Sequence, residues 1–380
     1  MSASVASNLL AWFDRTQRDL PWRRCRDPYA IWVSEVMLQQ TRADTVRPYW
    51  ERFMKRFPSV RELAEAPLDD LLKAWEGLGY YRRVRNLQTA ARQIMSRHGG
   101  QLPADASALR ALAGIGPYTA GAVASMAFGL AEPALDGNAV RVVSRLYEVA
   151  GDVSSAGVRA ELEAKIRALL AEKSARSRPG DLNQALMELG ATHCAPQSPR
   201  CEACPVRSEC RGWLGGEPAR LPLRRRKAPV PFAEIAVALC VEGDRVLVAR
   251  RPETGLLAGM MGFPAVVLQD GESLEEGSVR ALAVVGLRGE PIGPLLSYPF
   301  VFSSLRSRHQ VILVRRSGGE PAGGAFFADR QELAALALPA ALAPIRQVLD
   351  SAGDWHVLAA PTGVTMPVAD AALGSEAAVG

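Results

Sequence analysis

The spacing of apolar residues changes once along the chain, near residue 231. Before that point apolar positions recur every three to four residues, which is typical of helices with a buried face. Beyond it they alternate with polar positions, which predicts strands, and a Glu-Gly-Asp turn indicates a hairpin between the first two. The first pattern predicts helices over 28–41, 140–149, 158–173 and 181–191. The second predicts strands at 233–241, 245–249, near Val266, at 298–302 and at 310–314, and then a helix over 331–349.

The expected helix over 28–41 carries a carboxyl group in apolar surroundings. Asp27 is a typical N-cap and Pro28 a typical first helical residue. Apolar side chains surround nearly the whole helix, so it is expected to be buried together with Glu35. Burial raises the pKa of a carboxyl group toward the range useful to a general acid. A buried glutamate satisfied by backbone groups or by an arginine is the alternative.

Residues 112–142 combine three further features. Gly114-Ile115-Gly116 allows a tight turn between two short helices, and N–H groups at the start of the second helix can bind a phosphate. A run of small residues over 120–124 predicts close packing against a neighbouring segment. Asp136 follows in a turn ahead of the next helix, where N–H donors are expected to keep its carboxylate charged; a plain N-cap is the alternative role.

Residues 75–86 combine glycines, paired tyrosines and three arginines. Aromatic side chains can stack on bases and arginines can contact phosphates, so the segment is compatible with a loop that contacts nucleic acid. Packed tyrosines beside a solvated basic helix face explain the same residues equally well.

Four of the six cysteines fall within seventeen residues of each other, with the spacing Cys194-x6-Cys201-x2-Cys204-x5-Cys210. A Cys-x2-Cys pair within a set of four thiols indicates a metal site rather than a disulfide framework. Four thiolates suit either a zinc ion or a [4Fe–4S] cluster.

Composition adds only mild constraints. The 380 residues carry a net charge of +5 with a pI near 9.0, which is compatible with a polyanionic partner or simply with solubility. No apolar run is long enough to span a membrane, and the N-terminus lacks the pattern of a secretory signal. We therefore expect a cytoplasmic protein.

These motifs, in this order, resemble the adenine DNA glycosylases of the MutY type, within the endonuclease III helix-hairpin-helix superfamily. The resemblance covers residues 8–215, and a weaker one to the family's Nudix-like C-terminal domain covers 232–350. The motifs that carry it are Leu20-Pro21-Trp22-Arg23, Asp27-Pro28-Tyr29, Ser34-Glu35-Val36-Met37-Leu38-Gln39-Gln40-Thr41, Gly77-Leu78-Gly79-Tyr80-Tyr81, Gly114-Ile115-Gly116-Pro117-Tyr118, Leu135-Asp136-Gly137-Asn138, the four cysteines, Val246-Leu247-Val248-Ala249-Arg250-Arg251-Pro252 and Gly255-Leu256-Leu257-Ala258-Gly259.

The resemblance implies a multidomain protein: an all-α helix-hairpin-helix glycosylase domain with a [4Fe–4S] cluster loop, followed by an α+β Nudix-like domain. The glycosylase domain would cover 1–215, with a six-helix part at about 27–131 and an iron–sulfur part made of the N-terminal segment and 132–215. A basic, proline-rich linker over 216–231 and a lesion-recognition domain over 232–350 would follow. Residues 351–380 are expected to form a flexible tail.

The resemblance also implies an activity: removal of adenine mispaired with 8-oxoguanine or guanine in double-stranded DNA, by hydrolysis and without strand cleavage. It further implies a monomeric, nucleoid-associated enzyme, and it implies roles for individual residues. The catalytic set would be Glu35, Asp136, Tyr118 and Asn138, and the cluster ligands Cys194, Cys201, Cys204 and Cys210. The adenine pocket would use Arg18, Trp22, Arg23, Leu38, Gln184 and Met187, and DNA contacts Gln40, Thr41, Tyr80, Gly114 and Gly116. Lesion recognition would rest on Phe302, Ser303 and Ser304.

The sequence departs from the family at two places. No Arg-Glu-x-x-Glu-Glu metal helix follows Gly271, so phosphohydrolysis by the C-terminal domain is not expected. The family's lesion-reading strand ends in histidine where this chain has Ser304, and the nearest histidine is His309, five residues further on. Whether His309 compensates is open at this point.

The sequence argues against three alternative functions. A lyase that forms a Schiff base is disfavoured because there is no lysine between Lys73 and Lys165, whereas bifunctional relatives carry a catalytic lysine at the position of Tyr118. A non-catalytic DNA-binding protein with a structural metal would not need Glu35 and Asp136. A glycosylase for thymine or uracil opposite guanine would generally lack the C-terminal domain.

Overall fold

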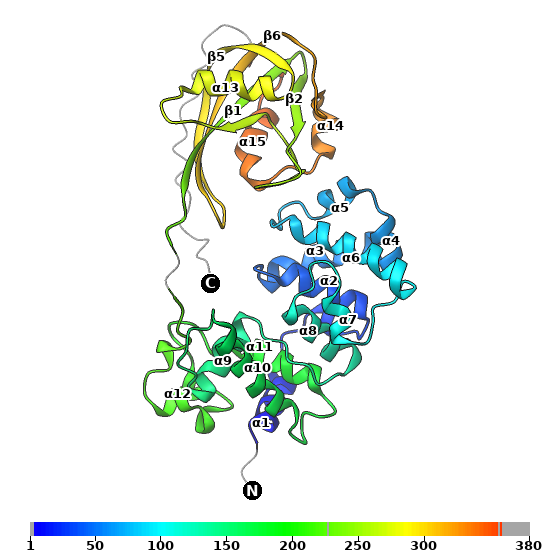
Figure 1. Ribbon diagram of the computed structural model, residues 1–380, viewed down its shortest axis with the longest axis vertical. Coiled ribbons are helices and arrows are strands. Elements are labelled where there is room, and N and C mark those ends of the chain that lie inside the picture. Colours follow the sequence, from blue (N-terminus) through cyan, green and yellow to red (C-terminus); the bar gives the residue numbers. More distant parts are fainter. Residues whose placement is uncertain (1–3, 226–227, 356–357, 359–380) are drawn as a thin grey trace. The chain divides into compact units, whose positions relative to one another are not determined.

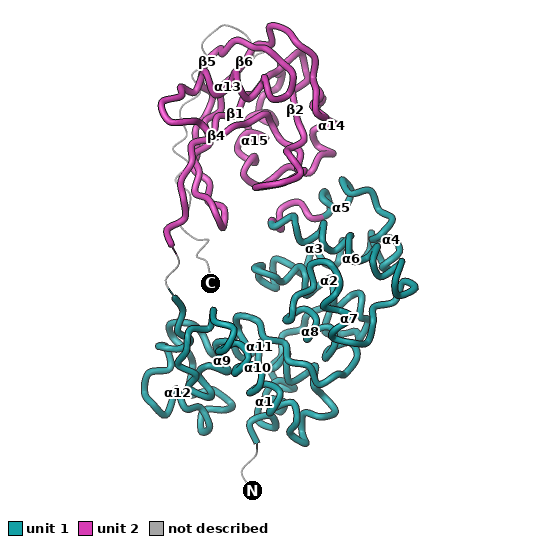
Figure 2. Tube along the Cα trace, viewed as in Figure 1, with its two compact units in different colours: residues 1–74, 80–227 teal, residues 75–79, 228–380 magenta. Residues whose placement is uncertain are grey.

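The computed structural model describes residues 4–225, 228–355 and 358. The chain divides into two compact units, residues 1–74 with 80–227 and residues 75–79 with 228–380 (Figure 2). Residues 226–227 of the expected linker and 359–380 of the expected tail lie outside the described residues.

The first unit is helical, as the spacing of apolar residues predicted (Figure 1). Its helices are α1 (Val5–Thr16), η1 (Pro21–Arg23), α2 (Pro28–Leu38), α3 (Ala43–Arg56), α4 (Val60–Glu65), α5 (Leu68–Ala74), α6 (Arg82–His98), α7 (Ala106–Arg110), α8 (Pro117–Phe128), α9 (Gly137–Tyr147), α10 (Ala156–Leu170), α11 (Pro179–Thr192), η2 (Cys201–Ala203), η3 (Arg207–Glu209), α12 (Arg211–Leu214) and η4 (Pro218–Arg220).

Helix α2 begins as predicted and ends earlier than predicted. The Asp27 side chain accepts a hydrogen bond from the Tyr29 N–H, and Pro28 is the first helical residue. Residues 29–37 are all buried, which confirms the interpretation of an apolar helix surrounded by protein. The helix stops at Leu38 instead of continuing to residue 41, because Gln39 leaves the helical region with a ψ of 111°; Gln40 follows with a left-handed φ of 59°.

Close approach between segments explains two glycines. Gly114, in the α7–α8 hairpin, has a φ of 73°, and a Cβ there would lie 2.6 Å from the Cβ of Asn86. Gly121 lies within α8, where a Cβ would lie 1.9 Å from the carbonyl oxygen of Pro133. The predicted hairpin and the predicted close packing of small residues are therefore both confirmed.

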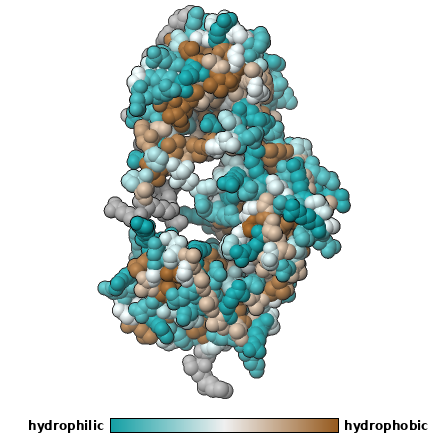
Figure 3. Space-filling model, in the orientation of Figure 1, coloured by the Kyte–Doolittle hydropathy of each residue, from teal (hydrophilic) through white to brown (hydrophobic). Residues whose placement is uncertain are grey.

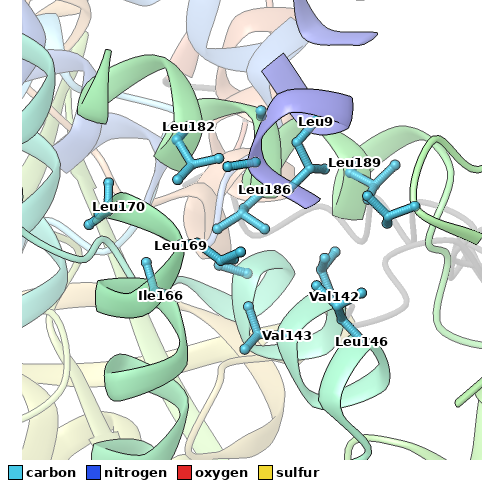
Figure 4. Packing of buried hydrophobic residues seen from close by; sticks show 14 of the residues in the cluster. Leu9, Val142, Val143, Leu146, Ile166, Leu169, Leu170, Leu182, Leu186 and Leu189 are labelled. Atoms are coloured by element: carbon cyan, nitrogen blue, oxygen red, sulfur yellow. The ribbon is translucent and has the colours of Figure 1, made fainter. Parts of the chain in front are cut away.

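The second half of this unit packs around an apolar cluster drawn from four helices (Figure 4). Leu9 of α1 faces the leucines of α11, while α10 borders the cluster at the left of the view and α9 lies below it. The labelled members are Leu9, Val142, Val143, Leu146, Ile166, Leu169, Leu170, Leu182, Leu186 and Leu189. This cluster fixes α9 and α11, two helices that carry expected site residues.

The second unit is built on a sheet with the strand order β3-β2-β1-β6-β5, with β4 paired to β1 and β7 to β2. Strand β1 pairs with β6 in parallel and the other described pairings are antiparallel. The strands are β1 (Phe232–Glu242), β2 (Arg245–Arg250), β3 (Met261–Gly262), β4 (Ala265–Val267), β5 (Leu287–Val301), β6 (Arg306–Gly319) and β7 (Phe326–Ala328). The helices are α13 (Leu274–Val284), α14 (Arg330–Ala335), η5 (Ala340–Leu342) and α15 (Ala343–Ser351).

Alternation along the strands divides their side chains between two apolar layers. Ala238 and Ile312 pack with Leu282 of α13, whereas Val237 and Val311 pack with Ile345 of α15. The predicted strands are confirmed, although β5 extends from Leu287 to Val301 and the prediction found only its end. The expected single helix over 331–349 was wrong: α14 ends at Ala335 and a break precedes η5 and α15.

Hydrophilic residues cover much of the visible surface, and hydrophobic residues gather on part of the visible face of the second unit (Figure 3). Large apolar side chains with high exposure are few in the described residues and lie mostly on the second unit; they include Leu214, Phe232, Val284 and Val301. No helix among residues 4–225, 228–355 and 358 is long and apolar enough to cross a membrane.

Candidate active site

Glu35 lies in the last turns of α2 and is only 4% exposed. The Tyr118 hydroxyl, from the start of α8, donates a hydrogen bond to Glu35 Oε2 and lies 3.5 Å from Met187 Sδ. Burial raises the pKa of Glu35 to about 7; the negative charge of Asp136 also raises it, while the Tyr118 hydroxyl and Arg23 lower it. The carboxyl group can therefore hold or release a proton near neutral pH.

Asp136 caps the N-terminus of α9. Its carboxylate accepts hydrogen bonds from the Ala139 N–H at 2.6 Å and from the Asn138 side-chain amide at 2.9 Å. These donors are the ones predicted, and they favour the charged form of the carboxylate. Burial outweighs them, and the pKa of Asp136 lies above its ordinary value.

Arg141 connects this carboxylate to the cysteine segment. Its Nη2 donates to Asn138 Oδ1 at 2.8 Å and to the Gly190 carbonyl at 2.7 Å, and its Nε donates to the Cys194 carbonyl at 2.6 Å. A Cβ at Gly190 would lie 2.5 Å from the Cβ of Asn138, so α11 approaches α9 closely here. Asn138 is thus held from two sides.

Glu188 is a residue that the sequence analysis missed. It is 1% exposed on α11, and it accepts hydrogen bonds from Arg18 Nε at 2.7 Å and from Arg23 Nη2 at 2.8 Å. Burial alone would raise the pKa of Glu188, but the bonds and charges of the two arginines outweigh it and bring the pKa to about 2. The only signal in the sequence is that Glu188 lies one helical turn after Gln184.

The other expected pocket residues lie on the same elements. Trp22 is buried in η1 with its ring 5.9 Å from that of Trp50, in an edge-to-face arrangement. Leu38 is the last residue of α2 and is partly buried. Gln184 and Met187 are partly buried on α11.

A cleft of about 420 Å³ opens beside Tyr118. The hairpin residues Gly114 and Gly116 line it, and so does Leu135, which precedes Asp136. Both glycines are exposed, and no side chain caps the N-terminus of α8. The expected phosphate-binding hairpin and Tyr118, the hydrogen-bond partner of Glu35, thus border one cleft.

Gln40 and Tyr80 both expose their side chains from left-handed backbone, with φ of 59° and 49°. Tyr80 is 45% exposed, Gln40 is exposed and Thr41 is partly buried. The interpretation of the arginines in 75–86 as phosphate contacts was wrong for Arg83, which is 8% exposed and donates to backbone carbonyls of α2. A buried guanidinium that binds carbonyl groups cannot also bind a phosphate.

The four clustered cysteines line a single small cavity, and none forms a disulfide. Arg145, which is 1% exposed, donates to Cys194 Sγ at 3.3 Å and to the carbonyls of Ala195 and Pro196 at 2.7 and 2.6 Å. Among the described residues, no three His, Cys, Asp or Glu side chains are arranged to hold a single metal ion.

Ser303 and Ser304 are exposed in the turn between β5 and β6, next to Phe302. His309 lies behind this turn, with its ring centroid 6.3 Å from that of Phe302. It is 4% exposed on β6, and its Nδ1 lies 3.2 Å from the Tyr298 hydroxyl. Burial, with the charge of Arg251, lowers the pKa of His309 to about 4.

Comparisons with known proteins agree with both units. Residues 33–168 match the HhH-GPD superfamily of base excision DNA repair proteins, and residues 236–348 match the NUDIX domain. The protein is thus an all-α HhH-GPD domain followed by an α+β NUDIX-like domain.

Three relatives illustrate the similarity. The adenine DNA glycosylase of Rattus norvegicus is 36% identical over 371 residues, covering 83% of this chain and 71% of the relative. That of Mus musculus is 39% identical over 319 residues, covering 70% of this chain and 61% of the relative. That of Buchnera aphidicola (strain Bp) is 32% identical over 264 residues, covering 69% and 74%. The chain therefore spans about three fifths of the length of two relatives: 61% of the mouse adenine DNA glycosylase and 58% of the human one.

Proposed function

This chain belongs to the adenine DNA glycosylase family, and from that premise we propose that it removes adenine from DNA by hydrolysing the N-glycosidic bond. The observation that carries the proposal is the pair Glu35 and Asp136. One carboxyl group is buried with a pKa of about 7, and the other is held by hydrogen-bond donors at the start of α9. Two carboxyl groups in different environments are what cleavage of a glycosidic bond requires.

Glu35 supplies the proton. Adenine leaves more readily once a ring nitrogen is protonated, and an acid with a pKa close to ambient pH is best suited to give that proton. The Tyr118 hydroxyl orients the Glu35 carboxyl group through its hydrogen bond. Asp136 stabilises the positive charge that develops on the sugar, either as a charge or through a transient covalent bond, and Asn138 and Arg141 hold it in place.

The target nucleotide must leave the base stack to reach these groups, since a base inside a duplex is inaccessible. Gln40 and Tyr80 fill or wedge the vacated stack, and both expose their side chains. The hairpin at Gly114 and Gly116 binds a phosphate beside the cleft. The adenine pocket is formed by Arg18, Trp22, Arg23, Leu38, Gln184 and Met187, with Glu188 holding its two arginines.

The reaction stops at base removal. Tyr118 occupies the position where bifunctional relatives carry a lysine, and a phenol cannot form a Schiff base with the sugar. The proposed substrate is duplex DNA with adenine opposite 8-oxoguanine or guanine, and the proposed enzyme is a monomer.

A [4Fe–4S] cluster is the proposed cofactor, with Cys194, Cys201, Cys204 and Cys210 as its ligands. A zinc ion needs all four sulfurs at about 2.3 Å from one point, whereas a cluster takes one thiolate on each of its irons. The four thiols line one cavity, and their spacing directly after a helical glycosylase-like region favours the cluster. The cluster would contribute charge and shape for DNA binding, and no chemistry.

Lesion recognition is proposed for the β5–β6 turn. Ser303 and Ser304 offer two exposed hydroxyl groups that can meet the carbonyl group or the N7–H of 8-oxoguanine. Phe302 is supported from behind by Phe300, with ring centroids 4.7 Å apart. His309 supports the Phe302 side of the turn, at 6.3 Å between centroids, and does not replace the histidine missing at position 304.

The test is base release under single-turnover conditions from duplexes containing A:8-oxoguanine, A:G and T:G. The proposal predicts release of adenine from the first two duplexes, fastest from the first, and no strand cleavage without alkali. Faster release from the T:G duplex would instead assign the enzyme to thymine opposite guanine.

A further inference from the structure

Arg83 binds the end of the helix that carries Glu35. It lies in the first turn of α6, and its Nη1 donates to the carbonyls of Val36 at 3.0 Å, Met37 at 2.8 Å and Gln39 at 2.6 Å. The last carbonyls of a helix have no partner within the helix, and a cation there also complements the helix dipole. Arg83 therefore satisfies the C-terminus of α2 from a segment more than forty residues away in sequence.

The same guanidinium reaches both loops that carry the proposed wedge residues. Its Nη2 donates to Thr41 Oγ1 at 3.3 Å, directly after Gln40, and its Cζ lies 5.5 Å from the centroid of the Tyr80 ring. Gln40 and Tyr80 are two of the four described non-glycine residues with positive φ. Such conformations persist only where the surroundings enforce them. For both residues Arg83 is part of those surroundings.

We propose that Arg83 is a positioning residue that fixes Gln40 and Tyr80 in their wedge conformations before DNA binds. The inference rests on the proposed function, because fixed conformations of Gln40 and Tyr80 matter only if the protein opens the base stack of DNA. Preorganisation lowers the entropy lost when the side chains enter the DNA. Burial lowers the pKa of Arg83 to about 10, so it stays charged at neutral pH.

The planar guanidinium is needed for this role. Arginine presents several donors in a fixed fork, so it can bind three carbonyl groups and a hydroxyl group while it lies against an aromatic ring. Lysine carries the same charge as a point and cannot reproduce that geometry. Arg83→Lys is therefore the informative variant, and Arg97→Lys, an exposed position in the last turn of the same helix, is its matched control.

The first experiment compares two duplexes under single-turnover conditions. In one, adenine opposite 8-oxoguanine is flanked by Watson–Crick pairs; in the other, mismatches on both sides leave the adenine already unstacked. For Arg83→Lys we expect at least about a tenfold loss of rate on the first duplex and recovery to nearly the wild-type rate on the second. Arg97→Lys should match the wild type on both.

Equal losses on the two duplexes would overturn the proposal, because Arg83 would then act through α2 and Glu35 rather than through the wedge residues. No loss on either duplex would overturn it as well. Inactivity of the wild-type protein on both would instead contradict the proposed function.

A second experiment tests the anchoring without DNA or activity. Amide hydrogen exchange of the intact protein should be faster in Arg83→Lys than in the wild type over residues 38–42 and 79–82, and unchanged in the core of α9 and α11. Unchanged exchange in the two loops would show that Arg83 does not hold them, whatever the reaction. Faster exchange throughout the helical unit would mean general destabilisation and would also overturn the proposal.

Discussion

The Tyr118 hydroxyl donates a hydrogen bond to Glu35 Oε2, joining the first turn of α8 to the end of α2 across 83 residues of sequence. The bond favours the charged form of Glu35, whereas burial favours the protonated form more strongly. The pKa of about 7 is the result of this opposition. Changing Tyr118 should therefore move the pH dependence of the reaction in a predictable direction.

Tyr118→Phe removes the hydrogen bond that lowers the pKa of Glu35, so that pKa should rise. If protonated Glu35 is the acid, activity is lost as pH rises through its pKa, and the falling limb of the single-turnover rate should move to higher pH. The maximum rate should also fall, because the carboxyl group loses its orientation. An unmoved falling limb would mean that Glu35 is not the titrating group.

Glu188→Gln should destabilise the helical unit. Removing one partner of a buried ion pair costs about 3–5 kcal/mol, and the lower end applies because Arg18 is partly solvated. The folded pKa of Glu188, about 2, lies below the ordinary value of 4.5. Its contribution to stability is therefore complete above pH 4.5 and is lost as pH falls toward 2. Urea unfolding at pH 7 and pH 3 checks this: the gap between wild type and variant should narrow at pH 3.

Metal content and cysteine variants distinguish a [4Fe–4S] cluster from a zinc ion at the four-cysteine site. Protein purified without oxygen should be brown and contain about four irons per chain. Cys204→Ser should lose iron and colour, while Cys240→Ser, at a buried cysteine of the second unit, should keep both. One zinc per chain in colourless wild-type protein would contradict the proposed cofactor.

The β5–β6 turn should determine the preference for 8-oxoguanine. Each lost hydrogen bond to a base costs roughly 1–3 kcal/mol of discrimination, so Ser303→Ala with Ser304→Ala should lower the ratio of rates on A:8-oxoguanine and A:G by about tenfold or more. Ser317→Ala, an exposed serine of β6, is the control. An unchanged ratio in the double variant would show that the turn does not read the lesion.

Local features were predictable from the sequence, and long-range ones were not. The Asp27 cap, the buried circumference of α2 and the glycine hairpin all follow from neighbouring residues. Glu188 forms ion pairs with Arg18 and Arg23, which lie 170 and 165 residues away in sequence. No local sequence pattern predicts partners at that distance. Arg83 was misinterpreted for the same reason, since an arginine in a basic segment resembles a phosphate contact until its carbonyl partners are known.

Most of strand β5 could not be predicted from the alternation of apolar and polar residues. Prolines at 291 and 294 interrupt the alternation of β5, and the register of β5 with β6 shifts at the same places. Only the final, regular part of the strand therefore gave a signal. The raised pKa of Asp136 was not predictable, because its hydrogen-bond donors follow from the turn, whereas its burial depends on distant segments.

Glu35 is proposed to deliver the proton that releases adenine. The single-turnover rate on an A:8-oxoguanine duplex from pH 5 to 9, measured for the wild type and for Glu35→Gln, tests this role. The wild-type rate should fall with a midpoint at about pH 7, as Glu35 loses its proton. Glu35→Gln should bind the duplex with nearly unchanged affinity and be slower by about 100-fold or more at low pH. If Glu35→Gln had a near-normal rate, or if its rate fell with pH as in the wild type, Glu35 would not be the proton donor.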